Sequence, residues 1–203
     1  MIDGVIKYSI EHLKQNTPLF SGYEELERLR TRLFTLGLIG VKDGIGYGNL
    51  SMQDKQSKSF FITATQTGRK QTLSREYYTY ISDYDFNTFK VVSQGEYKPS
   101  SEALSHAMIY AIDERITTVI HIHSSPLWNF MQEKNHLATT AEYGTAEMAE
   151  EIAKLYDNLD PMTNNAFVMK GHEEGIITFG QSIEEAELIL YNIIRTYLQK
   201  NEK

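Results

Sequence analysis

The chain has 203 residues, of which 41% are hydrophobic and 23% charged, and its net charge of −7 argues against a nucleic-acid-binding surface. This size and composition predict one globular domain, and the absence of cysteine excludes disulfides, thiolate metal ligands and a cysteine nucleophile. Charges close to the N-terminus argue against a signal peptide, and no apolar stretch reaches the length of a membrane span, so we expect a cytoplasmic protein without a membrane partner.

The first half of the chain predicts two helices followed by short strands. Residues 2–14 favour a short helix. Ser21 and Glu24 have the spacing of a capping box, and leucines then recur at helical spacing, which predicts an amphipathic helix over residues 23–38. Strands are expected at 59–64, 77–82 and 88–93, the last two as a hairpin, with a glycine-rich turn entering a strand at 43–51 and a loop at 65–68.

In the second half, helices and strands alternate. Helices are expected from about 101 to 113, 126 to 132, 145 to 157, and from 182 toward the C-terminus, and strands at 117–123, 166–170 and 176–179. Ser100 or Ser101, Thr145 and Ser182 are placed to cap three of these helices. Because short strands precede, separate and follow the helices, the pattern predicts the α/β class, as one layered domain around a mainly antiparallel sheet.

The strand at 117–123, T-T-V-I-H-I-H, carries a candidate metal site. His121 and His123 lie two residues apart, so their side chains share one face of the strand about 7 Å apart. Two such imidazoles can bind one metal ion, although two histidines on a half-exposed strand explain the motif alone equally well. A catalytic zinc site usually has three protein ligands. His172, in the turn G-H-E-E-G, is the best third candidate, and its alternative is a surface histidine.

Glu102 lies near the start of the helix that precedes this strand. The helix dipole favours a carboxylate there for structural reasons alone, whereas a position facing the metal would let it transfer a proton. We interpret His106, one turn later, as a structural residue or one that supports the site. Three segments carry small residues, which let the backbone approach an anion closely, and hydroxyl or amide groups, which can donate hydrogen bonds to it. Each segment alone is explained by turns and helix caps, but together they suggest a phosphate site. These residues are Gly46, Gly48, Asn49, Thr67, Gly68, Ser100 and Ser101.

Taken in order, the segments resemble the class II aldolase/adducin family over about residues 23–199. The similar pieces are G-N-L-S at 48–51, T-Q-T-G at 65–68, K-P-S-S-E at 98–102, H-I-H at 121–123, Y-G-T-A-E-M-A at 143–149 and G-H-x-x-G at 171–175. The resemblance implies a three-layer α/β/α fold with a central, mainly antiparallel sheet. It also implies a single domain over 1–203, with 1–22 as an N-terminal extension, and a homotetramer with active sites near subunit interfaces.

The resemblance also implies roles for individual residues. By position, His121, His123 and His172 would bind Zn²⁺ or another divalent metal, and Glu102 would be the acid/base. The residues expected to hold the substrate phosphate are Asn49, Thr67, Gly68, Ser100 and Ser101. The implied activity is that of an aldolase-type lyase of carbohydrate metabolism, which breaks or forms a C–C bond in a sugar phosphate or related hydroxy-ketone through a metal-stabilised enediolate.

Two alternatives stay open. One is an epimerase or dehydratase of the same family, and the other is a non-catalytic, adducin-like oligomerisation module. The three histidines and Glu102 favour an enzyme, because an interaction module has no physical need for them.

The sequence departs from the family at three places. Glu173 and Glu174 follow His172, where the family has glycine, and could repel phosphate or carry a proton. The tyrosine that aldolases use on the aldehyde side corresponds to Thr140 here, with Tyr143 nearby. The chain also ends soon after the last helix, without the tail that some aldolases fold over the site. The metal half of the mechanism therefore transfers better than the aldehyde half.

Overall fold

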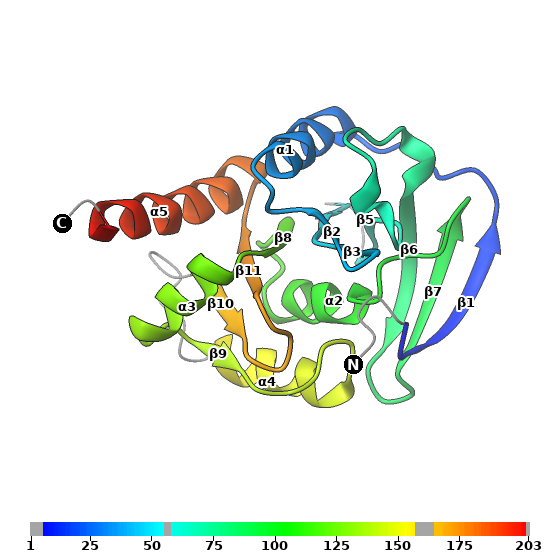
Figure 1. The fold of residues 1–203 in the computed structure, drawn as a ribbon. Coiled ribbons are helices and arrows are strands. Elements are labelled where there is room, and N and C mark those ends of the chain that lie inside the picture. The colour runs from blue at the N-terminus through cyan, green and yellow to red at the C-terminus, as the bar shows by residue number, and fades with distance from the viewer. Residues whose placement is uncertain (1–5, 55–57, 157–164, 202–203) are drawn as a thin grey trace.

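The computed structural model describes residues 6–54, 58–156 and 165–201, and a large mixed sheet runs through its centre (Figure 1). Within these residues the sheet has nine strands, in the order β1 (Ser9–Lys14), β7 (Lys90–Gly95), β6 (Tyr78–Asp85), β5 (Phe60–Thr63), β4 (Asn49–Gln53), β8 (Thr118–His123), β11 (Gly175–Gly180), β10 (Ala166–Met169) and β9 (Ala138–Thr139). The edge strands β1 and β9 pair in parallel with their neighbours, and the inner pairs are antiparallel. β2 (Gly40–Lys42) and β3 (Ile45–Tyr47) form a separate hairpin. The predicted mainly antiparallel sheet is confirmed.

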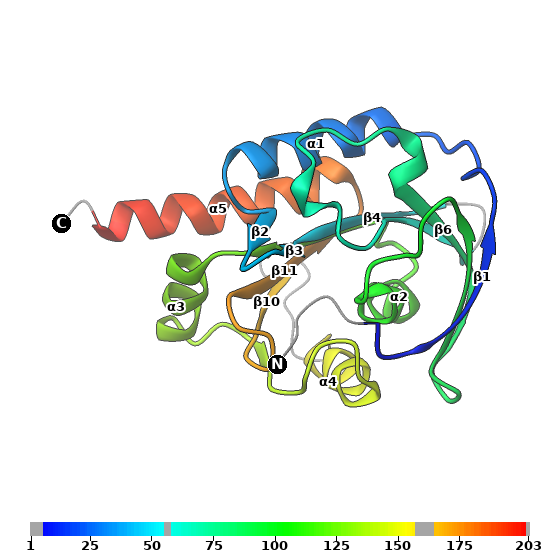
Figure 2. The ribbon, with the colours of Figure 1, turned by 45° about the vertical axis from the view of Figure 1, so that its right-hand side comes forward.

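Helices cover both faces of this sheet and complete three layers, with one layer above and one below it in Figure 2. One face carries α2 (Ala103–Ile112) and α4 (Ala146–Tyr156), and the other carries α1 (Tyr23–Thr35) and α5 (Ile183–Asn201), with α3 (Ser125–Glu133) packed against α5 and β10. Two short 3₁₀ turns, η1 (Thr67–Arg69) and η2 (Arg75–Tyr77), lie between β5 and β6. Each face of the sheet buries its own apolar cluster against its helices. The predicted α/β/α architecture is confirmed.

β8 lies inside the sheet, and its alternating side chains decide where the histidines point. Ile120 packs in the cluster under α1 and α5, whereas Val119 packs in the cluster under α2 and α4. Because alternate residues of a strand share a face, His121 and His123 lie on the α2 side with Val119. All six residues of β8 are buried, so the interpretation of a half-exposed strand is wrong.

Two local predictions are wrong for physical reasons. The segment expected as a helix over residues 2–14 contains β1, and its first residues lie outside the described part. β1 pairs in parallel with β7, and Ser9 N donates to Phe89 O at 2.9 Å. These hydrogen bonds to the sheet stabilise the extended conformation, whereas a short isolated helix is only marginally stable in water. At the start of α1, Gly22 is the N-cap in a left-handed conformation (φ 88°) with no side-chain cap, so Ser21 does not form the expected capping box. The other predicted helices and strands are confirmed to within a few residues, as far as they are described, but the expected glycine-rich turn at 43–51 also contains β3, which was not predicted.

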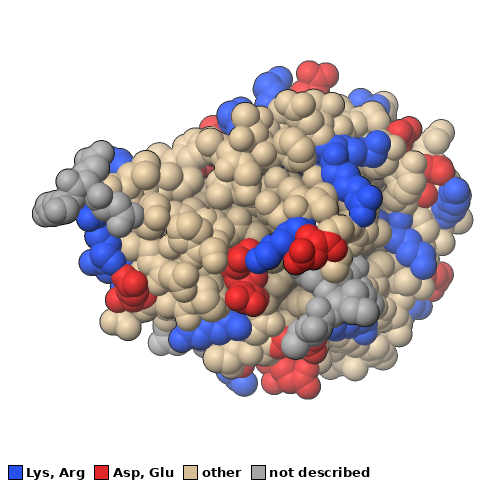
Figure 3. Space-filling view, in the orientation of Figure 1, with Lys and Arg blue, Asp and Glu red and all other residues tan. Residues whose placement is uncertain are grey.

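The surface of the described residues is mixed in charge. Acidic and basic side chains lie interspersed on the face shown in Figure 3. Across the described residues, no helix is long and apolar enough to cross a membrane.

Candidate active site

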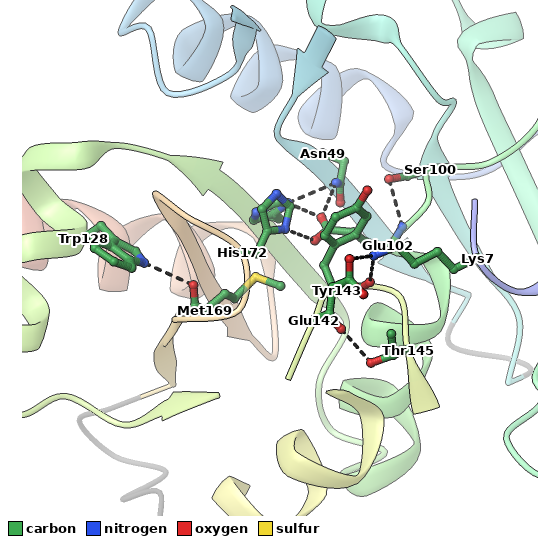
Figure 4. Close-up of polar contacts among 11 residues, drawn as sticks. Lys7, Asn49, Ser100, Glu102, Trp128, Glu142, Tyr143, Thr145, Met169 and His172 are labelled. Carbon is green, nitrogen blue, oxygen red and sulfur yellow. Dashed lines mark hydrogen bonds and ion pairs between the residues drawn. The ribbon is translucent and has the colours of Figure 1, made fainter. Parts of the chain in front are cut away.

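Three buried histidines from two separate segments meet on the α2 face of the sheet (Figure 4 labels His172). His121 and His123 come from β8, and His172 comes from the turn between β10 and β11. One ligand nitrogen from each lies within 4.8 Å of the others, and the three rings are 4.6–5.1 Å apart between centroids. His172 is only 7% exposed, so the alternative of a surface histidine is wrong.

The β10–β11 turn is shaped to bring His172 to β8. His172 N donates to Met169 O at 3.2 Å, and Gly175 N donates to His172 O at 2.9 Å. Gly175 then pairs with His123 as β11 begins. A Cβ at position 175 would lie 2.9 Å from His172 O and 3.3 Å from His121 Nε2, which only glycine avoids. The antiparallel pairing of β11 with β8 therefore places the third histidine beside the first two.

The Glu102 carboxylate lies directly against two of the histidines. Its Oε2 contacts His121 Nδ1, its Oε1 lies 3.0 Å from His172 Nδ1, and Asn49 Nδ2 donates to Oε2 at 2.7 Å. Burial raises the pKa of Glu102, but the charges and hydrogen bonds of His121 and then His172 outweigh it and bring the pKa well below the ordinary value. The carboxylate is therefore held in its charged form beside the histidines.

Glu102 reaches this position as the N-cap of α2, which begins one or two residues later than the sequence predicted. Ser100 Oγ accepts a hydrogen bond from Glu102 N at 3.3 Å, so the expected capping hydroxyl contacts the first turn without being the N-cap residue. Glu102 is 1% exposed. The helix start thus directs this side chain inward.

The donor set fits a divalent metal ion. His121 Nε2 is buried and has no hydrogen-bond partner among the described residues. Such a buried polar atom costs about 1–3 kcal/mol unless it has a partner, and a cation can be that partner. Three imidazoles are a ligand set of catalytic transition-metal sites, and a carboxylate on a second ring nitrogen orients such ligands.

The residues predicted to bind an anion line the same cavity as the histidines. Thr67 and Gly68 lie at η1, and Ser100 and Ser101 lie just before α2. A side chain at Gly68 would clash with the carbonyl oxygen of Gly40, so the backbones of η1 and β2 are in direct contact here. The cavity is lined by Gly46, Tyr47, Gly48, Asn49, Thr67, Gly68, Ser100, Ser101, Glu102, His121, His123 and His172, with the 64–66 loop between them. The structure therefore brings every predicted site residue to one place.

Arg30 supports the segment that contains Thr67 and Gly68, and the sequence analysis did not identify it. Its guanidinium is 1% exposed and donates to Thr67 O at 3.0 Å and to Gln71 O at 2.8 Å. Burial lowers the pKa of Arg30 from its ordinary value, but a guanidinium still keeps its positive charge, here next to Thr67. The available signal was its position: Arg30 follows Leu29 on the buried face of α1.

A second cavity shares Tyr47, His123 and His172 with the first. Tyr47 lies against His123 with 5.2 Å between ring centroids, and the cavity continues past the β2–β3 hairpin. Glu174 forms an ion pair with Lys42 at 2.7 Å, and Glu173 is exposed. The residues that line this second cavity include Lys42, Ile45, Tyr47, His123, Tyr143, Lys170, His172, Glu173 and Glu174.

Tyr143, rather than Thr140, contacts the histidines. The Tyr143 ring is 2% exposed and lies 4.4 Å from the His172 ring between centroids. Thr140 instead binds Glu151 of α4 through its backbone N at 2.5 Å and its hydroxyl at 2.7 Å. The tyrosine that contacts His172 is thus Tyr143, three residues after the position at which the aldolases have theirs.

The comparisons with known proteins agree with this architecture. The model of the family described as "Class II Aldolase and Adducin N-terminal domain" matches residues 40–197. Among solved structures, an L-fuculose 1-phosphate aldolase is 24% identical, with a TM-score of 0.66 over 91% of this chain and 89% of that chain. YgbL from Escherichia coli is 19% identical (TM-score 0.66, 87% and 86% covered), and a sugar-phosphate aldolase from Thermotoga maritima is 16% identical (TM-score 0.65, 85% and 90% covered). No curated protein matches the chain. At these identities the structural likeness shows a shared fold.

Proposed function

Because the chain belongs to the class II aldolase and adducin family, we propose that it is a metal-dependent aldolase-type lyase acting on a sugar phosphate or a related hydroxy-ketone. One observation carries the proposal: three histidines, a buried carboxylate and a loop suited to an anion line a single cavity. Two of the similar structures are named as sugar-phosphate aldolases, and these names support this substrate class.

His121, His123 and His172 would hold the metal, for which we propose zinc, because neutral imidazoles are its preferred nitrogen ligands. When bound, the ion would act as a Lewis acid toward a carbonyl oxygen of the substrate. The contacts of Glu102 with His121 and His172 would keep the two imidazoles oriented.

Glu102 would move the proton. Its carboxylate would take a proton from the carbon beside the substrate carbonyl and return it in the reverse direction. The hydrogen bond from Asn49 Nδ2 orients this carboxylate, and burial keeps water away from it.

The segments that carry Asn49, Thr67, Gly68, Ser100 and Ser101 would hold the phosphate. These five residues line the cavity, and the buried Arg30, which donates to Thr67 O, adds positive charge behind them. The second cavity, which shares His123 and His172 with the first, gives the rest of the substrate room to extend. The substrate would then lie across the histidines, with its phosphate on the side of these segments.

A retro-aldol assay on a panel of ketose phosphates tests the proposal. We expect the zinc-loaded protein to release an aldehyde from at least one of them and a chelator to stop the reaction. Epimerised or dehydrated products would instead identify the chain as an epimerase or a dehydratase. A protein that binds no zinc and turns over no member of the panel would contradict the proposal.

The Glu102→Gln variant tests the proton transfer separately. An amide keeps the shape of the carboxylate, and its oxygen can still accept a hydrogen bond from a histidine Nδ1–H and so orient that ring, but it cannot take up the proton. We therefore expect the variant still to bind metal, with turnover reduced by about 10²–10⁴-fold. Glu133→Gln is the matched control, because Glu133 pairs with Lys200 at the surface and should keep wild-type rates. Full activity of Glu102→Gln would refute the role given to Glu102.

We also propose that the chain forms a homotetramer, as the family likeness implies. Leu188 and Leu198 on α5 are 59% and 53% exposed, and the C-terminal end of α5 extends away from the body in Figure 1. Light scattering coupled to size exclusion measures the mass in solution, and a monomer would contradict this proposal.

A further inference from the structure

Lys7 and Tyr8, just before β1, lie against the candidate site, although they fall outside residues 40–197 matched by the family model. Tyr8 is buried, and its hydroxyl donates to Ser100 O at 2.7 Å. The neighbouring Lys7 points to a different part of the site, the segment of Glu142 and Tyr143 (Figure 4). Two consecutive residues thus contact the start of α2 and the segment before α4.

Lys7 makes three contacts through a single ammonium group. Its Nζ donates to Tyr143 O at 3.1 Å, forms an ion pair with Glu142 Oε1 at 2.6 Å, and lies 3.8 Å from the centroid of the Tyr143 ring. The Lys7 side chain is 22% exposed, so water screens these contacts only in part. Together they fix both the backbone and the ring of Tyr143.

The Tyr143 ring packs against the His172 ring. The two rings lie 4.4 Å apart between centroids at 38°, and the Glu102 carboxylate contacts His172 Nδ1. The next residue, Gly144, has φ 67°, and a Cβ there would lie 3.0 Å from Ser101 O. The segment is therefore seated tightly between the start of α2 and His172.

From these contacts we propose that Lys7 is a positioning residue for the histidine site: it holds Tyr143 against His172 and so keeps the His172 imidazole directed toward His121 and His123. The inference rests on the proposed metal function of the three histidines. Groups that orient metal ligands from behind typically change metal affinity by about 10–100-fold when they are removed.

The Lys7→Met variant tests it, because methionine keeps an apolar stem over the Tyr143 ring and removes the ammonium. We expect zinc affinity, measured by competition with a chromogenic chelator, to fall about 10-fold. Lys7→Arg should recover most of the loss. Lys14→Met is the control: Lys14 lies on β1 and pairs with Glu96 at 3.0 Å on the surface, so its affinity should stay at the wild-type value.

A double-mutant cycle separates positioning from a general loss of structure. Tyr143→Ala should weaken zinc binding at least as much as Lys7→Met, and the double variant should lose no more than Tyr143→Ala alone, since Lys7 acts through Tyr143. Additive losses would overturn the proposal, as would a Lys7→Met protein with wild-type affinity.

The metal-free protein supplies a second measurement. The Tyr143 ring current should shift the carbon-bound proton signals of His172, and Lys7→Met should move these signals while Lys14→Met leaves them in place. Unmoved His172 signals would overturn the role of Lys7, even if the wild-type protein bound no zinc. Absence of zinc binding in the wild type would contradict only the proposed function.

Discussion

Gly175 lets β11 pass directly beside the His121 ring. A methyl group there would meet His172 O at 2.9 Å and His121 Nε2 at 3.3 Å. We expect Gly175→Ala to displace the His121 ring and the His172 turn, and to weaken zinc binding by about 10-fold or more in isothermal titration. Gly95→Ala is the control, since its Cβ would also meet close neighbours, the nearest being Thr17 Oγ1 at 3.3 Å, but away from the site. Wild-type zinc affinity in Gly175→Ala would show that the ring has room to move.

His106 is completely buried one turn beyond Glu102, with Nδ1 2.7 Å from Ser51 Oγ. Burial lowers the pKa of His106 from 6.5 to about 3, although the nearby Glu102 charge opposes this shift. The unfolded chain therefore binds more protons than the folded one between these two pH values. His106 should thus lower the free energy of unfolding by up to a few kcal/mol as the pH falls through this window, with no effect above it.

The variant His106→Asn isolates this effect, because its amide oxygen can still accept the Ser51 hydroxyl but does not titrate in this range. In urea titrations at pH 7.5 and 4.5, we expect the wild type to lose more stability on acidification than the variant does. Equal losses in the two proteins would mean that His106 is already protonated in the folded state.

At the scale of elements, two serine–glutamate pairs share one spacing but differ in the structure. Ser182 Oγ accepts from Glu185 N at 3.2 Å at the start of α5, whereas Gly22 replaces Ser21 as the N-cap of α1. We expect Ser182→Ala to lower the free energy of unfolding by about 1 kcal/mol, and Ser21→Ala to change it by less than about 0.5 kcal/mol, in urea titrations. A larger effect of Ser21→Ala would show that its cap forms in solution.

The same contrast shows how far the sequence could predict the molecule. The β8 strand and the amphipathic α1 were predictable, since period-2 and period-3.6 patterns are local properties of the chain. β1 was not, because its conformation depends on pairing with β7 from a distant part of the chain. Likewise, the motif order suggested His172 as a ligand, but only the pairing of β11 with β8 brings it to His121.

Lys7 and Arg30 escaped the sequence analysis for a related reason. Each is a cation whose partner, Tyr143 or Thr67, lies in a distant loop, so even the position of Arg30 on the buried face of α1 does not show what it binds. From composition and periodicity alone, lysine and arginine are expected to be solvent-exposed.

At the scale of the whole molecule, metal binding would link parts of the chain that the sheet alone holds together. β8 carries two of the histidines, and the β10–β11 turn carries the third; α3 and α4 lie between them in the chain. An unfolded chain cannot hold these three groups together, so a metal that binds only the folded state adds to its stability. The gain is about 2.7 kcal/mol when free metal is 100-fold above its dissociation constant.

Zinc should therefore raise the melting temperature. For a chain of this length, that gain corresponds to a shift of about 5–10 °C in calorimetry, fully reversed by a chelator. His123→Ala should abolish the shift, because two remaining imidazoles bind a metal far more weakly than three. His136→Ala should keep it, because His136 follows α3 and is not part of the histidine cluster. If His123→Ala and the wild type gained the same shift, zinc would be acting elsewhere on the molecule, and the three histidines would have to be explained without a metal.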